Sequence, residues 1–350
     1  MPTPPDPTAA PDPLEVLAAL PLELLPGLYQ LSQSLFALVR LGLPAYLHAQ
    51  GPTPLDGLAA ATAIDPRLLH HLLEIGRGLG LLARDERHCY GLTDKGRRLC
   101  PDAEDTVLPI LSHLDDGYAA WGALHQGLTT GQVPFQAAYG SDIFPWLANH
   151  PYSNRQFNRF METTVERWLA ATGDCYPFAG HLVDLGGNTG ALTALLLTQF
   201  PTLRATLFDL EQALDGAPAR LAAAGVAARC TLVAGSFFEP ATIPTDGDLY
   251  LFSRVLLNWS DAQAVAILTN CRRVMPPAAR LLILDFVRPE PTPPGLLFGS
   301  LNLWVMFGAR SRTREEFAAL LAAAGFVAPR WMAVGAEPGS PLFLLEARPG

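Results

Sequence analysis

The chain has 350 residues and a net charge of -9, and 49% of its residues are apolar while only 16% are charged. This length exceeds that of one compact core, so we expect two domains. Because binding to phosphate backbones requires a clustered basic face, and no basic run is present, the composition argues against a nucleic-acid partner. The low charged fraction also favours an oligomer over a monomer.

The cysteines and the N-terminal segment indicate a cytoplasmic protein. The five cysteines are scattered, with no C-x-x-C pair and no histidine at metal-ligand spacing, so neither a disulfide framework nor a metal site is expected. Residues 1–13 are rich in proline and lack the features of a signal peptide, which predicts a disordered lead-in. No stretch approaches the roughly 18 uninterrupted apolar residues that a membrane helix needs.

Residues 14–100 predict a mainly helical domain of the winged-helix kind. Apolar residues at helical spacing from Leu14 to His48 predict two or three helices. A small helix, a second helix ending near Gly78 and a short hairpin around Asp85 to His88 follow. Since neither the second helix nor the hairpin is strongly basic, we expect this domain to serve in dimerisation rather than in DNA binding.

The rest of the chain predicts a helical, aromatic-rich linker and cavity segment at residues 101–178, followed by a catalytic domain at residues 179–350. In the second part, short apolar strands alternate with helices, which indicates a doubly wound, mostly parallel sheet of the α/β class. A last strand without a following helix is expected to lie antiparallel at the edge of the sheet. The expected strands are residues 181–184, 205–208, 231–234, 249–252, 280–285 and 341–347.

A glycine-rich turn carries the main functional signal. The sequence from Asp184 to Gly190 reads D-L-G-G-N-T-G and joins an apolar strand to a helix expected at residues 191–200. Glycines let the backbone approach a ligand, and the first turn of a helix has unpaired N–H groups. Asp209 ends the next strand, where a carboxylate can accept hydrogen bonds from ribose hydroxyls. The pattern predicts a nucleoside site, and the alternative is a tight turn followed by a helix cap.

Five motifs then suggest a family. They are VDLGGNTG, LFDLEQAL, VAGSFFEP, LYLFSRVLLNWSDAQAVAILTNCRRVM and GARSRTREEFAALLAAAGF. From Leu14 to its end, the chain resembles the class I methyltransferases of the plant caffeate and bacterial small-molecule O-methyltransferase type. The resemblance implies a winged-helix dimerisation domain before a Rossmann-like domain with a seven-stranded sheet. It further implies S-adenosyl-L-methionine as cofactor, a homodimer and a small-molecule substrate, with no nucleic acid and no membrane insertion.

The resemblance also assigns site residues. Gly186 and Gly187 are expected beside the methionine portion of the cofactor and Asp209 on its ribose. The expected cofactor contacts also include Asp184, whose acid suits a cationic cofactor, Ser236 and Phe237 near the adenine, and Ser253 at the end of the fourth strand. Ser236 replaces the acid usual in the family, so its adenine contact is expected to differ. Met161 is expected at the junction of cofactor and substrate. Apart from the resemblance, the apolar residues Trp304 and Met306 are expected to line the substrate cavity.

The catalytic pattern of the family is broken at Leu257. The family reads H-D-W where this chain reads Leu257-Asn258-Trp259, and its histidine removes the proton from the substrate hydroxyl. Ser311 likewise stands where the family often has a glutamate that orients the histidine. Of this set only the acid Asp285 survives, and leucine cannot accept a proton.

Three interpretations remain open. The first is methyl transfer by proximity and alignment to a carbon, nitrogen or oxygen of a planar, largely apolar metabolite. The second is a different base, either Asp285 or a residue near the expected cavity. The third is a member that keeps the cofactor bound but catalyses a hydroxylation, decarboxylation or pericyclic reaction. The other candidate bases are His113, His125, Asp115, Asp116, Tyr118 and Tyr139.

Overall fold

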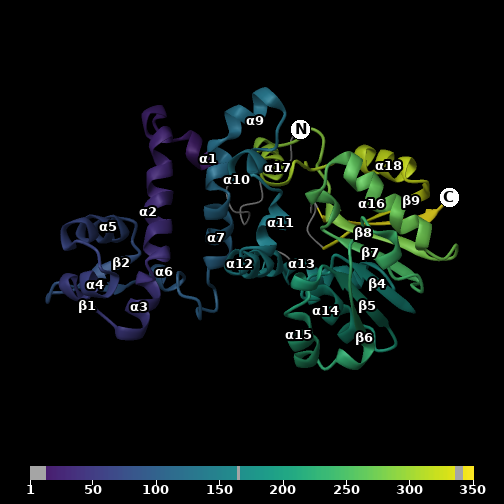
Figure 1. Cartoon of the computed structure of the whole chain (residues 1–350), viewed down its shortest axis with the longest axis horizontal. Helices are drawn as coiled ribbons and strands as arrows, with labels where there is room; N and C mark the ends of the chain where they lie inside the picture. Colours follow the sequence, from purple (N-terminus) through teal and green to yellow (C-terminus); the bar gives the residue numbers. More distant parts are fainter. Residues whose placement is uncertain (1–12, 164–165, 336–341) are drawn as a thin grey trace. The chain divides into compact units, whose positions relative to one another are not determined.

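The computed structural model describes residues 13–163, 166–335 and 342–350. The chain divides into two compact units, residues 1–116 and residues 117–350 (Figure 1). The domain boundaries expected after residues 100 and 178 stay predictions. Apart from Pro13, the predicted lead-in lies outside the described residues. Among the described residues, no helix has the length and apolar character needed to cross a membrane.

The first unit has the predicted order of two helices followed by a hairpin. Helix α5 starts at Pro66 because Asp65 caps it: the Asp65 carboxylate accepts the backbone N–H of Arg67 at 2.8 Å. The small sheet has the order β1-β3-β2. The elements of this unit are α1 (Pro13–Ala18), η1 (Leu22–Gly27), α2 (Leu28–Arg40), α3 (Leu43–Gln50), β1 (Thr53–Pro54), α4 (Leu55–Thr62), α5 (Pro66–Gly78), β2 (Leu82–Arg84), β3 (Cys89–Leu92), α6 (Asp94–Arg97) and α7 (Leu108–Asp116).

The second unit begins with the helical, aromatic-rich segment that the sequence predicts. Its helices are α8 (Tyr118–Gly122), α9 (Leu124–Thr130), α10 (Pro134–Tyr139), α11 (Ile143–Ala148), α12 (Pro151–Thr163) and α13 (Glu166–Cys175). Phe135 and Phe157 are buried in one core cluster with Met306 of helix α17 (Pro294–Phe307). The Trp168 side chain, one of the expected aromatic groups, lies outside the described residues. Most aromatic side chains of this segment therefore serve in packing.

A seven-stranded, mostly parallel sheet follows and confirms the predicted fold class. Its strand order is β6-β5-β4-β7-β8-β10-β9. The strands are β4 (His181–Leu185), β5 (Arg204–Asp209), β6 (Cys230–Ala234), β7 (Leu249–Ser253), β8 (Arg280–Phe286), β9 (Phe326–Ala333) and β10 (Leu342–Pro349). The helices between them are α14 (Ala191–Gln199), α15 (Ala217–Ala223), α16 (Asp261–Val274), α17 and α18 (Arg314–Ala323), with short 3₁₀ turns at η2 (Glu211–Ala213), η3 (Ala227–Arg229), η4 (Pro240–Thr242) and η5 (Leu256–Asn258).

Both faces of this sheet are buried, which explains its almost continuously apolar strands. In β7, Leu249 and Leu251 belong to one core cluster while Tyr250 and Phe252 belong to another, because successive side chains point to opposite faces. Helices α14 and α15 cover the first face and α16 and α18 the second (Figure 1). Ser260 and Thr313 start α16 and α18 with capping boxes.

The expected position of the last strand was wrong. Strand β10 is antiparallel, as predicted, but it lies between β8 and β9, and β9 forms the edge. The sequence analysis missed β9, which contains Pro329 and is mostly exposed along its length. Proline cannot donate to a sheet ladder and is confined to edge strands, so the residue that concealed this strand also fits its position. The expected start of β10 at Pro341 lies outside the described residues.

The strand order reverses between β4 and β7. Strand β4 pairs with β5 on one side and with β7 on the other, and all three run parallel. Their carboxyl ends therefore meet at one edge, next to the turns that lead into α14 and η5. In open α/β sheets, ligands bind in the crevice at such a reversal.

Candidate active site

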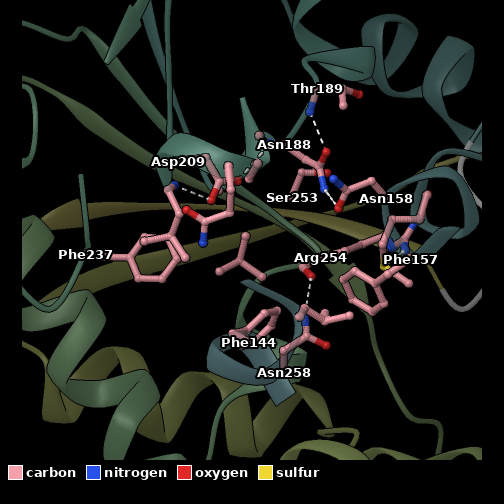
Figure 2. A pocket seen from close by; sticks show the side chains of 18 of the residues that line it. Phe144, Phe157, Asn158, Asn188, Thr189, Asp209, Phe237, Ser253, Arg254 and Asn258 are labelled. Atoms are coloured by element: carbon pink, nitrogen blue, oxygen red, sulfur yellow. Dashed lines mark hydrogen bonds between the residues drawn. The ribbon is translucent and has the colours of Figure 1, made fainter. Parts of the chain in front are cut away.

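A cavity of about 590 Å³ lies at the carboxyl ends of β4, β5 and β7, within the second unit (Figure 2). Glycines and carboxylates of the strand ends form one part of its wall. Aromatic side chains of α11, α12 and the segment after β7 form another part. This combination of a few polar groups with an apolar wall is typical of small-molecule sites.

The glycine turn after β4 is held so tightly that side chains are excluded. Gly186 has φ +78°, a left-handed conformation, and a Cβ there would lie 2.7 Å from Val255 Cγ2. A Cβ on Gly187 would lie 2.3 Å from Leu207 Cδ1 and 2.5 Å from Asp184 Oδ2. Backbone atoms thus form this part of the wall, directly before the N-terminus of α14.

Asp209, at the end of β5, binds the backbone of the glycine turn. Its Oδ2 accepts the backbone N–H of Asn188 at 2.9 Å and its Oδ1 accepts that of Leu210 at 2.7 Å (Figure 2). Burial raises the pKa of this carboxyl to about 6. Each carboxylate oxygen can accept a second hydrogen bond, so Asp209 can still bind two neighbouring hydroxyls of a ligand.

Asp184, at the buried end of β4, braces the helix that follows. The Thr193 hydroxyl of α14 donates to Asp184 Oδ2 at 2.5 Å. The buried Oδ1 has no hydrogen-bond partner among the described residues, and desolvation raises the pKa of the carboxyl to about 6. Asp184 also contributes to the cavity wall, so a second acid lies next to the glycine turn.

Helix α12 is fastened to the glycine turn by polar side chains that the sequence analysis did not single out. Asn188 Nδ2 donates to Asn158 Oδ1 at 2.8 Å. Thr189 donates to the Glu162 carboxylate, which also pairs with Arg220 at 2.7 Å. These contacts join residues at least 27 positions apart, so no local pattern in the sequence could have indicated them.

The apolar part of the cavity is built from aromatic rings. Phe144 of α11 stacks on Trp259 with centroids 5.3 Å apart and meets Phe157 of α12 edge-on at 6.3 Å. Phe238 packs edge-on against Trp259 at 4.9 Å, and Phe237 does so at 6.1 Å. Flat rings around an open space favour a flat, apolar ligand.

The segment after β7 carries two polar residues that face the cavity, Arg254 and Asn258. Arg254 has φ +56°, unusual for a residue with a side chain. Its Nη1 donates to the Met161 carbonyl oxygen at 3.1 Å and its Nη2 contacts the Met161 sulfur at 3.1 Å. Asn258 Nδ2 donates to the Arg254 carbonyl oxygen at 3.3 Å (Figure 2).

Arg312 holds this segment in place from beneath. Its side chain is fully buried. Its Nη1 donates to the Leu256 carbonyl oxygen at 2.7 Å and its Nη2 to that of Trp259 at 2.6 Å, while Asp261 pairs with its Nε at 2.9 Å. Arg312 therefore fixes the backbone on both sides of residues 257–258.

Asp285, the surviving acid, is buried beneath the same segment. Its Oδ1 accepts the backbone N–H of Phe286 at 2.8 Å. Desolvation raises its pKa to about 7, against which the nearby Arg312 and Arg254 act. Its Oδ2 has no hydrogen-bond partner among the described residues.

The structure brings together most of the residues expected from the sequence. Those that line the cavity are Asp184, Gly186, Gly187, Asp209, Ser236, Phe237, Ser253 and Met161. Leu257, Asp285, Trp304 and Met306 are not among the described residues that line it. Met306 is buried and Trp304 packs in the same cluster, which also contains Phe157, so both lie behind the aromatic wall.

The alternative bases are also not found in the wall. His113, Asp115 and Asp116 belong to the first unit, where burial lowers the pKa of His113 to about 4 and Asp115 pairs with Arg40 at 2.6 Å. Tyr118, His125 and Tyr139 belong to the second unit but are not among the described lining residues. A base from this set stays a prediction.

Comparison with known proteins defines the class of this fold and site. Residues 121–327 match the model of the O-methyltransferase domain, and residues 22–102 match that of the O-methyltransferase dimerisation domain. The protein is an S-adenosylmethionine-dependent methyltransferase. It belongs to the O-methyltransferase family whose members carry this dimerisation domain before the catalytic domain.

Three relatives illustrate the similarity. A phenazine O-methyltransferase of Lysobacter antibioticus is 34% identical over 95% of this chain and 96% of its own. The crystal structure of LaPhzM is 33% identical, with a TM-score of 0.81 over 97% of this chain and 100% of the other. An O-methyltransferase from neocarzinostatin biosynthesis, in complex with S-adenosyl-L-homocysteine and 1,4-dihydroxy-2-naphthoic acid, is 27% identical, with a TM-score of 0.78 over 98% of this chain and 100% of the other.

The relatives do not share one reaction. A phenazine-1-carboxylate N-methyltransferase of Pseudomonas aeruginosa is 29% identical over 85% of this chain. An aclacinomycin 10-hydroxylase of Streptomyces purpurascens is 31% identical over 79% of it. Family membership therefore establishes the cofactor more firmly than the acceptor, which is the small molecule that receives the methyl group.

Proposed function

We propose that the chain methylates an oxygen, nitrogen or carbon of a planar, largely apolar small molecule of the secondary-metabolite type, without a histidine base. One observation carries this proposal: a single cavity joins the glycine turn and Asp209 to a wall of aromatic rings that includes Phe144 and Trp259. The names of the relatives support it, since they describe methylation of aromatic oxygen or nitrogen.

The residues around the glycine turn fit the cofactor. Gly186 and Gly187 leave room for a ligand against the backbone, and Asp209 has acceptor capacity for the two hydroxyls of a ribose. The orphaned Oδ1 of Asp184 supplies negative potential for a cationic ligand. In our proposal these residues hold the methionine and ribose portions, Ser236 and Phe237 flank the adenine, and Ser253 contacts the cofactor from β7.

The hydrogen bonds around Ser236 support an adenine contact that differs from the one made by the acid usual in the family. Its hydroxyl oxygen accepts the backbone N–H of Phe238 at 3.3 Å, and Asn270 holds the Phe237 carbonyl oxygen at 3.0 Å. The segment is therefore ordered without the acid usual in the family. We infer that ring packing by Phe237, rather than a carboxylate, provides most of the adenine contact.

In our proposal, the aromatic residues of the cavity wall align the acceptor, which is the molecule that receives the methyl group, and exclude water from it. When bound, S-adenosylmethionine supplies an electrophilic methyl group on a sulfonium. Phe144, Phe157 and Trp259 form flat surfaces on which an aromatic acceptor can stack, and Met161 lines the same cavity. Alignment of this kind lowers reaction barriers by about 7–11 kcal/mol in favourable cases. A proximity mechanism can therefore operate although Leu257 offers no base.

A direct proton-transfer role for Asp285 stays a prediction. Its raised pKa of about 7 suits a base, but its carboxyl lies beneath the segment that bears Leu257, and it is not among the described cavity residues. We infer that Asp285 acts on the acceptor indirectly, through its electrostatic interaction with Arg254, which lines the cavity. We likewise propose that Trp304 and Met306 shape the cavity by supporting Phe157.

Incubation of the purified protein with methyl-labelled S-adenosylmethionine and an extract of its host tests the proposal. A labelled aromatic product, formed together with an equal amount of S-adenosylhomocysteine, is the expected result. Turnover of an acceptor without S-adenosylhomocysteine would instead establish the non-methylating alternative. Two observations support that alternative. One relative is a hydroxylase, and Leu257 stands where the family has its histidine.

We also propose that two copies associate through the dimerisation domain at residues 22–102. Leu22, Leu24 and Tyr29 of η1 and α2 are 75%, 55% and 52% exposed, and burying them would remove apolar surface from water. Light scattering on the purified chain should give twice its 37.6 kDa. A mass of one chain at micromolar concentration would contradict the proposal.

A further inference from the structure

Arg254 is a cation on the cavity wall with few partners of its own. A guanidinium has five N–H donors. In Arg254 two of them reach Met161, one its carbonyl oxygen and one its sulfur, each at 3.1 Å. The buried Nε has no partner among the described residues. Three N–H groups thus remain without a partner among the described residues.

Among the described residues, no carboxylate forms a close ion pair with this cation. Asp285 acts on it electrostatically, but not as an ion pair at 4.0 Å or less. Two acids of the cavity wall already have other partners: Glu162 pairs with Arg220, and Asp209 binds two backbone N–H groups. Desolvation lowers the pKa of Arg254 to about 10, so the side chain is still a cation at neutral pH.

A purely structural role accounts for only part of this arrangement. The bond to the Met161 carbonyl oxygen lies in the last turn of α12, where basic side chains often bind carbonyl groups. That bond needs one donor and no burial. Yet Arg254 also adopts a left-handed backbone at φ +56°, and such strain in a residue with a side chain is concentrated at functional sites. Burying an unpaired charge is costly unless an anion completes the site.

We propose that Arg254 binds a negatively charged oxygen of the acceptor and thereby selects acidic planar molecules. The oxygen belongs either to a carboxylate substituent or to the ionised hydroxyl that is methylated. The assignment rests on the proposed function, because it places the aromatic acceptor in this cavity. Met161, which Arg254 touches, lines the same cavity, so the cation lies where acceptor and glycine turn meet.

This assignment offers a substitute for the missing histidine. A cation beside a hydroxyl favours its ionised form and lowers its pKa, typically by one to three units for a close pair. An acceptor bound as its anion has already lost the proton that a histidine would remove. Leu257 then does not need to act as a base. Arg254 stabilises the ionised oxygen of the acceptor and transfers no proton itself.

Two pairs of probes test the proposal and separate the two sources of the charge. Phenazine-1-carboxylate and phenazine-1-carboxamide have nearly the same shape but differ in charge, and calorimetry in the presence of S-adenosylhomocysteine measures their affinities. For the hydroxyl, binding of 4-nitrophenol is followed by the visible absorption of its anion, with nitrobenzene as the ligand that cannot ionise. Each pair is measured on the wild type, Arg254→Met and Arg254→Lys.

In at least one pair, we expect the wild type to prefer the anionic probe by about tenfold to hundredfold, which is the worth of a charge-assisted hydrogen bond. Arg254→Met should abolish this preference and Arg254→Lys should retain part of it. Arg204→Met, at an exposed arginine that begins β5, should leave it unchanged. The affinity for S-adenosylhomocysteine should change less than threefold in all variants, which also shows that they fold.

Three results would overturn the proposal. One is a preference for the anionic probe that survives in Arg254→Met. Another is a large loss of S-adenosylhomocysteine affinity in that variant with the acceptor preference intact, because the bound anion would then be the carboxylate of the cofactor. The third is the lack of any preference in the wild type. Failure of every aromatic probe to bind would in addition contradict the proposed substrate class, whereas equal binding of charged and neutral probes would leave that class standing.

Discussion

The two parts of the cavity are built by different means. Around the glycine turn, the wall is backbone, and its shape follows from glycines at fixed positions and from the ends of paired strands. Around the aromatic wall, the shape follows from side chains such as Phe144 and Trp259, which lie more than 100 positions apart in the chain. A backbone wall tolerates little change, whereas a side-chain wall can be rebuilt for a new acceptor. The names of the relatives, which include an O-methyltransferase, an N-methyltransferase and a hydroxylase, fit this contrast.

The largest effect is expected at the backbone wall. In Gly187→Val the new side chain would meet Leu207 and the Asp184 carboxylate, since even a Cβ would lie 2.3–2.5 Å from them. Overpacking of this kind costs about 3 kcal/mol, and the turn must move. We expect S-adenosylhomocysteine binding to disappear from calorimetry and the melting temperature to fall. Gly299→Val, in α17 where nothing lies within 4 Å of an added Cβ, is the matched control and should keep binding without a fall in melting temperature. Normal binding by Gly187→Val would show that the turn is not rigid.

The next effect concerns the stability of the protein and Asp285, which is buried beneath the segment that follows β7. Burial raises its pKa to about 7 from 3.8, so between about pH 4 and 7 the folded protein holds a proton that the unfolded chain has lost. Stability should therefore fall as the pH rises through this window. Asp285→Asn mimics the protonated form and should gain up to about 4 kcal/mol over the wild type at pH 8, with little gain at pH 4. Thermal unfolding at both values measures this, and a gain that is independent of pH would contradict the raised pKa.

Removal of the proposed ribose contact should have a smaller effect that is confined to the cofactor. Asp209→Ala should weaken S-adenosylhomocysteine binding by at least about tenfold, because a buried charge-assisted hydrogen bond is lost. Calorimetry gives the value directly. Unchanged affinity would refute the placement of the ribose and would leave Asp209 as a brace for Asn188 alone.

The smallest effect is expected from restoring the histidine of the family. Leu257 is not among the described cavity residues, so Leu257→His should change kcat with the natural acceptor less than about threefold, below 1 kcal/mol. A pH–rate profile of both proteins measures this. A strong loss of activity would show that Leu257 forms an apolar wall next to the reacting atom, and a strong gain would show that a base is limiting.

The difference between the backbone wall and the side-chain wall also explains which features could be predicted from the sequence. The glycine turn, Asp209 and the parallel sheet follow from local patterns, because strands, turns and helix starts are encoded by neighbouring residues. The contact of Arg254 with Met161 joins positions 93 apart, and only packing brings them together. Trp304 and Met306 were expected in the wall from their apolar character, yet apolar character does not distinguish a wall from the core behind it. Strand β9 was missed because Pro329 and its exposed residues lack the alternation of a buried strand.

Arg312 gives the segment after β7 a fixed backbone on which a side chain can be changed. It binds the backbone at Leu256 and Trp259, on either side of residues 257 and 258. Of these two residues, Asn258 lines the cavity, whereas Leu257 is not among the described lining residues. Exchange of Asn258, with Arg312 kept, is therefore the natural starting point for redirecting this enzyme to other acceptors.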